Sequence, residues 1–181
     1  PAGGGCKELA LRAARWAAQS GASGEVLGNL SPTFMTVAMG KMSKSAHEAI
    51  DLGFGKAGDS ILFNARELLF VALKEARLLA DAGYVPPVPA RGVPVAGRAG
   101  IASMEMTLVN MREGGMISAH DYRVSRAVAV ALCGGEIEYG SLVDEAWLLA
   151  VERQQFLELL KTPETQARIK HMLDTGKPLR N

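Results

Sequence analysis

A glycine-rich turn meets the start of a helical pattern in the first nine residues, Pro1-Ala2-Gly3-Gly4-Gly5-Cys6-Lys7-Glu8-Leu9. Glycine accepts positive φ and has no Cβ, so a ligand can approach its backbone closely. A helix N-terminus also presents unpaired N–H groups, which can hold an anion or a polarised water. These residue types are compatible with a backbone binding site. The alternative is a flexible leader in front of a helix, and a glycine-rich turn alone does not decide between the two.

The histidines and cysteines do not form a recognisable metal site. None of His47, His120 and His171 has a Cys, Asp or Glu at a metal-ligand spacing, and Cys6 and Cys133 form no CxxC pair. His47 and His120 stand at predicted helix starts, where we expect solvated polar side chains. His171 stands near a helix C-terminus, where a cation suits the dipole. We expect the two cysteines to be buried thiols in a reducing cytoplasm rather than a disulfide.

Several other polar residues have types that could do chemistry, but no spacing supports it. A pair of glutamates could move protons, and serines could act as nucleophiles. No spacing singles out a glutamate pair, and no elbow motif surrounds a serine, so surface charge is the default interpretation. Isolated arginines on helices could meet phosphates but are expected mainly to solubilise. The residues considered are Glu105, Glu113, Glu136, Glu138, Glu145, Glu152, Ser103, Ser125, Ser141, Arg98, Arg123 and Arg126.

Composition indicates a globular protein of one domain or two small ones. The chain has 181 residues, 48% hydrophobic and 22% charged, with a net charge of +1. This charge gives no reason to expect a nucleic acid or an anionic membrane as partner. The sequence predicts neither a transmembrane helix nor a signal peptide, so we expect a cytoplasmic protein. The chain starts at Pro1 without a Met, and we expect it to be a piece of a longer protein.

Helical spacing and capping signals predict a mainly α fold before residue 85. Alanine, leucine and arginine favour a first helix over about 7–19. Ser31 and Pro32 predict a second helix start, and Ser45 with Glu48 a third at a capping box. The segment 60–63 is the strand candidate, and a strong helix is expected over 65–82.

The prolines of the segment 85–96 predict an extended linker and the best domain boundary. Four helices are expected beyond it, each with a start signal, a stop signal or both. They cover about 99–112, 118–134, 141–160 and 162–176, with Ser118, Ser141 and Thr162 as the expected starts.

Both ends of the chain resemble known enzymes. The first nine residues resemble the Pro-Gly-Ala-Gly-Gly-Thr-Gln-Arg-Leu stretch of the crotonase family, the enoyl-CoA hydratases and isomerases. Gly40 followed by 45–54 is similar to that family's Gly…Ser-Ala-x-Glu-Ala-x-x-x-Gly-Leu-Val segment, and 60–63 and 65–82 fall where it has a closing strand and helix. The segment 162–181 resembles the extreme C-terminus of bacterial fused enzymes, in which a 3-hydroxyacyl-CoA dehydrogenase part precedes an enoyl-CoA hydratase part.

The resemblance implies a domain order. Residues 1–84 would be the C-terminal helices of a crotonase-like domain with one short strand, 85–96 the linker, and 97–181 a small helical domain. This sequence departs from the family by extra residues before Gly40 and by Gly53-Phe54 in place of Gly-Leu.

The resemblance also implies a mechanism. In the family, backbone N–H groups form an oxyanion hole for the thioester carbonyl, and glutamates move protons as water adds across the double bond. A backbone N–H of the glycine-rich stretch helps to hold the water, and the matching position here is Ala2. Gly3 and Gly4 become candidates for substrate binding. The family's catalytic glutamates precede this stretch, so the 181 residues alone are expected to be inactive.

The expected parent is therefore a multifunctional enzyme of fatty-acid β-oxidation that acts on acyl-CoA thioesters. NAD would serve its dehydrogenase part, while these residues hold no cofactor, because no strand-Gly-x-Gly-x-x-Gly-helix unit is present. The expected partners are the rest of the parent chain and further copies in a homo-oligomer. The alternative is a non-catalytic helical module for oligomerisation or docking in a β-oxidation complex, whose uncovered apolar helix faces would favour self-association.

Overall fold

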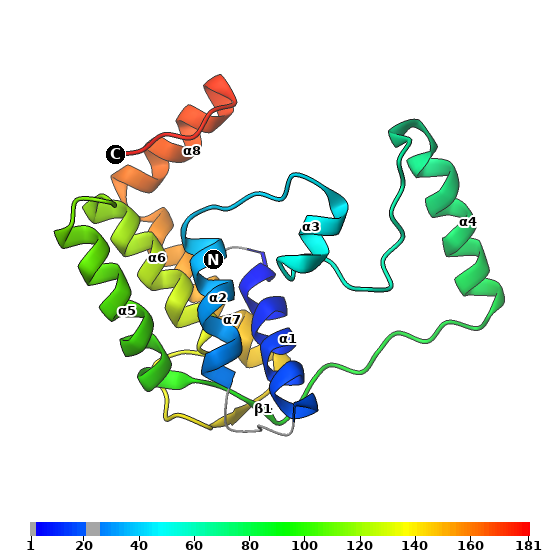
Figure 1. Ribbon diagram of the computed structural model, residues 1–181, viewed down its shortest axis with the longest axis horizontal. Helices are drawn as coiled ribbons and strands as arrows, with labels where there is room; N and C mark the ends of the chain where they lie inside the picture. The colour runs from blue at the N-terminus through cyan, green and yellow to red at the C-terminus, as the bar shows by residue number, and fades with distance from the viewer. Residues whose placement is uncertain (1–2, 21–25) are drawn as a thin grey trace. The chain divides into compact units, whose positions relative to one another are not determined.

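The computed structural model describes residues 3–20 and 26–181 and is mainly helical. The chain divides into two compact units, Pro1–Lys41 with Ala90–Asn181, and Met42–Pro89. Figure 1 labels the α-helices of both units and strand β1.

The larger unit is a helical assembly with one small sheet. Its helices are α1 (Gly5–Gln19), α2 (Val26–Ala38), α5 (Gly97–Glu113), α6 (Ala119–Leu132), α7 (Glu145–Leu160) and α8 (Pro163–Thr175). Strands β1 (Val93–Pro94) and β2 (Leu142–Val143) pair antiparallel, with Val93 opposite Val143.

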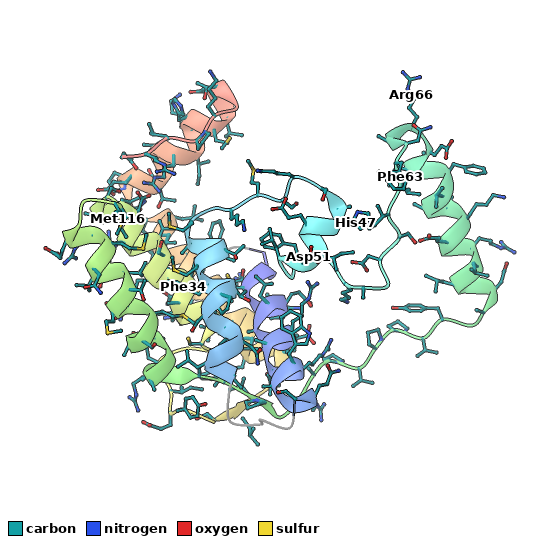
Figure 2. The ribbon with its side chains drawn as sticks, viewed as in Figure 1. Phe34, His47, Asp51, Phe63, Arg66 and Met116 are labelled. Atoms are coloured by element: carbon teal, nitrogen blue, oxygen red, sulfur yellow. The ribbon has the colours of Figure 1, made fainter. Side chains whose placement is uncertain are left out.

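Helix α6 is central to this unit, because it contacts α1, α2, α5 and α7 (Figure 1). In its second half, every residue of Ala127–Leu132 is buried. A helix that is apolar all round is typical of a core helix rather than a surface one. Phe34 of α2 (labelled in Figure 2) and Leu108 of α5 are almost completely buried in the same core.

A close backbone approach fixes the start of α5. The N–H of Gly97 donates to the carbonyl of Cys133 at 2.9 Å, and the N–H of Arg98 donates to that of Ile137 at 2.8 Å. Gly97 has a φ of +52°, and a Cβ there would lie 2.2 Å from the Ile137 oxygen. Only glycine meets both requirements, so this residue ties α5 to the turn after α6.

The smaller unit contains α3 (Ala46–Asp51), the 3₁₀ turn η1 (Ala65–Glu67) and α4 (Leu68–Asp81). Ser45 caps α3 by accepting from the Glu48 N–H at 3.1 Å. No hydrophobic residue of 42–89, all of which are described, is fully buried.

Most predicted helices are confirmed. The first, third and 65–82 helices form, as do those of the C-terminal half at about 99–112, 118–134 and 162–176. The capping box of Ser118 and Asp121 is present, and Thr162 caps α8 with Pro163 at its first position. A mainly helical fold is thus confirmed, whereas its crotonase-like character stays a prediction.

Three predicted local elements are wrong. Segment 60–63 is irregular, because its unit offers no strand to share its backbone hydrogen bonds, and Phe63 is 95% exposed. The second helix begins by Val26 and contains Pro32, so Ser31 is no cap and donates to the Leu27 carbonyl instead. The helix expected from Ser141 starts at Glu145, because residues 142–143 pair with β1 and Asp144 caps.

The division of the chain also differs from the predicted one. Residues 1–41 pack with 90–181 through contacts of α1 and α2 with α5, α6 and α7, so 1–84 is not one contact unit. The linker region 85–96 is irregular except for β1 and marks the end of the smaller unit. The assignment of 1–84 and 97–181 to named domains stays a prediction. None of the helices in the described ranges is long and apolar enough to cross a bilayer.

Candidate functional site

The first turn of α1 carries the most distinctive polar arrangement in the larger unit. Oε1 of Glu152 accepts from the N–H groups of Gly4 at 3.2 Å and Cys6 at 3.3 Å, and Oε2 accepts from that of Lys7 at 2.8 Å. Glu152 lies on α7 and is only 1% exposed. Gly4 has a φ of +106° and no side chain to cap the helix itself. A carboxylate from a distant helix therefore accepts from N–H groups that the helix itself leaves unpaired. The helix dipole also favours a negative charge at this end.

A second carboxylate extends this arrangement through Lys7. The Nζ atom of Lys7 lies 2.8 Å from Oε1 of Glu145 and 2.5 Å from Oε1 of Glu8. Oε2 of Glu145 accepts from the Ala90 N–H at 3.1 Å. Partial burial opposes the charge on Lys7, but the hydrogen bonds of Glu145 and Glu8 outweigh it and raise the pKa of Lys7. The Lys7 ammonium in turn lowers the pKa of Glu145. Both ends of α1's first turn are thus anchored to α7.

The predicted site residues lie at this turn. Ala2 is outside the described residues, and Gly3 is exposed. Gly4 is buried, and its N–H is the one that donates to Glu152. The roles predicted for these residues in holding water or substrate stay predictions. For Gly4, such a role would require Glu152 to give up its hydrogen bond.

Glu152 is the residue that sequence reasoning missed, since it was expected to be a surface charge. A usable signal exists: Leu148, Glu152 and Leu159 are four and seven residues apart, and they are the buried residues of α7. That spacing places the carboxylate on the buried stripe of its helix. The sequence does not say which donors it meets there.

The other candidate glutamates take part in surface pairs, as expected. Glu105 and Glu136 both contact Arg126, at 3.1 Å each, and Glu105 also accepts from the Tyr122 hydroxyl. Glu138 pairs with Arg98. These glutamates are thus paired with arginines, as is typical of surface charges.

His120 contradicts its prediction, because it is 94% buried rather than solvated (6% exposed). Its Nε2 lies 3.0 Å from Oγ1 of Thr165, which lies 2.8 Å from Oγ1 of Thr162. Thr162 donates in turn to the Leu159 carbonyl at 2.7 Å. Burial, reinforced by the Arg168 guanidinium, lowers the pKa of His120 below its usual value of 6.5. His120 therefore links the start of α6 to the cap of α8 in its neutral form.

A cleft of about 510 Å³ lies beside His120, between α6, α7 and the start of α8. Its charged and amide lining mixes both signs, with Arg123, Arg126, Gln155, Glu158 and Glu164. This mixture selects neither an anion nor a cation, and it gives no basis for naming a ligand.

The cysteines and the remaining histidines do not form a reactive or metal-binding centre. Cys6 and Cys133 are free and buried, as predicted. Burial raises the pKa of Cys6 to about 11 and that of Cys133 to about 12, so neither is a thiolate near neutral pH. His47 is exposed on α3 (Figure 2), and His171 lies on α8. Within the described ranges, no three His, Cys, Asp or Glu residues gather as metal ligands would.

The described residues do not fit a dinucleotide such as NAD. Their sheet has two antiparallel strands of two residues each, whereas dinucleotide sites use parallel strands that lead into helices through glycine-rich turns. At the starts of α1 and α5, several N–H groups are also occupied. Glu152 takes those of α1, and the carbonyls of Cys133 and Ile137 take those of Gly97 and Arg98.

Comparison with known proteins gives one informative match. The whole chain is 39% identical over 181 residues to a protein of Bacillus subtilis (strain 168) named a probable 3-hydroxyacyl-CoA dehydrogenase. The chain spans 22% of the length of that relative. No protein-family model matches the chain. No solved structure matches it. The match supports the dehydrogenase part of the resemblance described above and does not bear on the hydratase part.

Proposed function

We propose that this chain is the C-terminal part of a longer, cytoplasmic enzyme of fatty-acid β-oxidation. That enzyme joins an NAD-dependent 3-hydroxyacyl-CoA dehydrogenase to a crotonase-type enoyl-CoA hydratase, and it acts on acyl-CoA thioesters. The observation that carries the dehydrogenase assignment is the 39% identity over every residue of the chain to 22% of a probable 3-hydroxyacyl-CoA dehydrogenase. The hydratase assignment rests on the motifs at the two ends of the chain.

Within that enzyme, these residues have a structural role and carry out no chemistry by themselves. At the glycine-rich turn, the N–H groups of Gly4, Cys6 and Lys7 donate to Glu152, so these three are not free to bind a substrate or water. The described residues lack the parallel strands of a dinucleotide site, and by the motif resemblance the catalytic glutamates would precede Pro1. The Glu152 and Lys7 contacts instead support a role for α1 in holding α7 and its neighbours in place.

A second candidate is a helical module for oligomerisation or docking in a β-oxidation complex. The specific observation in its favour is the smaller unit, where no hydrophobic residue of 42–89 is fully buried. Such a surface favours association with another chain or domain.

Two assays on two proteins test these proposals. The 181-residue chain and the longer protein that contains it are each given a 3-hydroxyacyl-CoA with NAD, and separately crotonyl-CoA. We expect NADH formation and crotonyl-CoA hydration by the longer protein, and neither by the 181-residue chain. NADH formation without hydration would remove the hydratase part. Turnover of crotonyl-CoA by the 181 residues alone would refute their structural role. The module becomes the better explanation if the longer protein has neither activity.

A further inference from the structure

Helix α4 is well formed and yet lacks a hydrophobic partner. None of its residues is buried, and its leucines and phenylalanine are half exposed or more, including Leu69 at 70%, Phe70 at 62% and Leu78 at 68%. Most stability of a helix in a protein comes from packing an apolar face, because isolated helices of this length are marginal in water. The sequence of α4 is therefore adapted to a surface that the smaller unit does not supply.

The apolar residues of α4 are not confined to one stripe. With about 100° between successive residues, Leu69 and Leu73 point one way, while Phe70 and Leu78 lie on other sides of the helix. The charged residues of α4 are Lys74, Glu75, Arg77 and Asp81. Arg77 pairs with Asp81 at 3.0 Å, and the Lys74 ammonium lies 5.0 Å from the Phe70 ring. These charged side chains lie around Phe70 and Leu78, so apolar side chains occur on opposite sides of the helix.

The apolar surface continues beyond both ends of the helix. Phe63, just before η1 and labelled in Figure 2, is 95% exposed. Tyr84, Val85 and Val88 follow the helix and are exposed by 58% to 83%. The uncovered surface is therefore longer than α4 itself, and we refer to residues 63–88 as the α4 segment.

We propose that the α4 segment docks into the remaining part of the longer chain and is buried there as a core helix. This inference rests on the proposed function, because it requires that longer chain. The relative matched over the whole chain is several times longer, so it carries polypeptide that could cover this segment on the same molecule. Covalent linkage gives such a partner a high effective concentration.

A second copy of the chain explains the segment less well. Pairing of two α4 helices would cover one stripe on each and leave the opposite side exposed. Fourteen residues also make only two heptads, fewer than the three or four that a coiled coil sustains. A surface that is apolar on several sides needs a partner that surrounds it, as the body of a larger domain does.

Hydrogen–deuterium exchange of the backbone amides of 68–81 tests the proposal directly. The exchange is measured in the 181-residue chain and in the longer protein, over a series of protein concentrations. We expect exchange to be about a hundredfold slower or more in the longer protein and independent of concentration in both. Equal exchange in the two proteins would overturn the proposal. Protection in the 181-residue chain that rises with its concentration would also overturn it, in favour of a second copy.

Two variants of the longer protein give an independent readout. Leu69→Glu places a charge on the apolar side that carries Leu69 and Leu73, and Lys74→Glu places the same residue at a position that is already charged. We expect Leu69→Glu to restore fast exchange at 68–81 and to promote aggregation, and Lys74→Glu to leave exchange unchanged. Equal effects of the two variants would contradict docking through the apolar side.

NADH formation from a 3-hydroxyacyl-CoA, measured on the same samples, separates this inference from the proposed function. Protection without activity removes the dehydrogenase assignment and supports docking. Activity without protection retains the assignment and overturns docking.

Discussion

Replacing Glu152 tests the cap at the start of α1, because its carboxylate accepts hydrogen bonds from the N–H groups of Gly4, Cys6 and Lys7 and is only 1% exposed. A hydrogen bond to a charged acceptor contributes about 1.5–3 kcal/mol, and the bonds at 3.2 and 3.3 Å belong at the low end. Burying the carboxylate costs several kcal/mol and offsets part of this gain. Removing the side chain leaves the donors buried without their acceptor, and we expect Glu152→Ala to cost about 3–5 kcal/mol of the free energy of unfolding.

The isosteric variant Glu152→Gln separates the charge and the acceptors from packing. Its amide keeps one oxygen, so its NH₂ group must face either the Lys7 N–H or those of Gly4 and Cys6. At least one buried donor then opposes another donor, and we expect a loss of about 2–3 kcal/mol. Both tryptophans, Trp16 and Trp147, lie in the larger unit, so urea unfolding followed by their fluorescence reports on it alone.

Glu138→Gln is the matched control, because this glutamate is exposed and paired only with Arg98 at the surface. We expect it to change the free energy of unfolding by less than about 0.5 kcal/mol. If both Glu152 variants unfold at the same urea concentration as this control, the cross-helix cap contributes nothing and the reasoning is refuted.

Three further predictions follow from the larger unit. Gly97→Ala should lower the free energy of unfolding by about 2–5 kcal/mol, because the added Cβ would meet the Ile137 carbonyl. Gly92 also has positive φ but has open space around it, so Gly92→Ala should lower the free energy of unfolding by only about 1–2 kcal/mol. Equal urea midpoints for the two variants would show that the Ile137 carbonyl does not restrict position 97. Since the pKa of His120 is lowered, its unfolded form binds the proton first, so stability should fall as pH drops through about 6.5 and below. His120→Gln should flatten that fall between about pH 7.5 and about pH 5, and an unchanged slope would exclude His120 as its source. The buried thiols of Cys6 and Cys133 should react with a thiol reagent at least about a hundredfold faster in urea than in the native state, and fast native labelling would contradict their burial.

Local signals in the sequence predicted the C-terminal half well. Ser118 with Asp121, Thr162 with Pro163, and Gly176 with its positive φ each act within four residues of their partners. Capping chemistry of that range can be read from spacing alone. The same applies to Ser45 at the start of α3, whose hydroxyl accepts from the third residue after it.

Such local signals do not predict which residues pair with partners far away in the sequence. Asp144 rather than Ser141 caps α7, because the residues between them form a strand whose partner, β1, is some fifty positions earlier in the chain. Conversely, 60–63 has the composition of a strand and no partner, so it stays irregular. The donors of Glu152 lie about 145 positions away, and no helical period reveals them.

The Glu152 cap has a consequence for the organisation of the chain. Because it joins α1 to α7, and α1 and α2 also contact α6, the first forty residues share a core with those after position 90. The intervening residues 42–89 are thus inserted in the sequence between the two parts of that unit, whereas the motif resemblance predicts that they share a crotonase-like domain with α1. An insertion with no buried hydrophobic residue cannot offset the conformational entropy of ordering its chain. No residue of 42–89 belongs to the hydrophobic core of the larger unit, so destabilising α1 through Glu152 should leave exchange in α4 of the 181-residue chain unchanged.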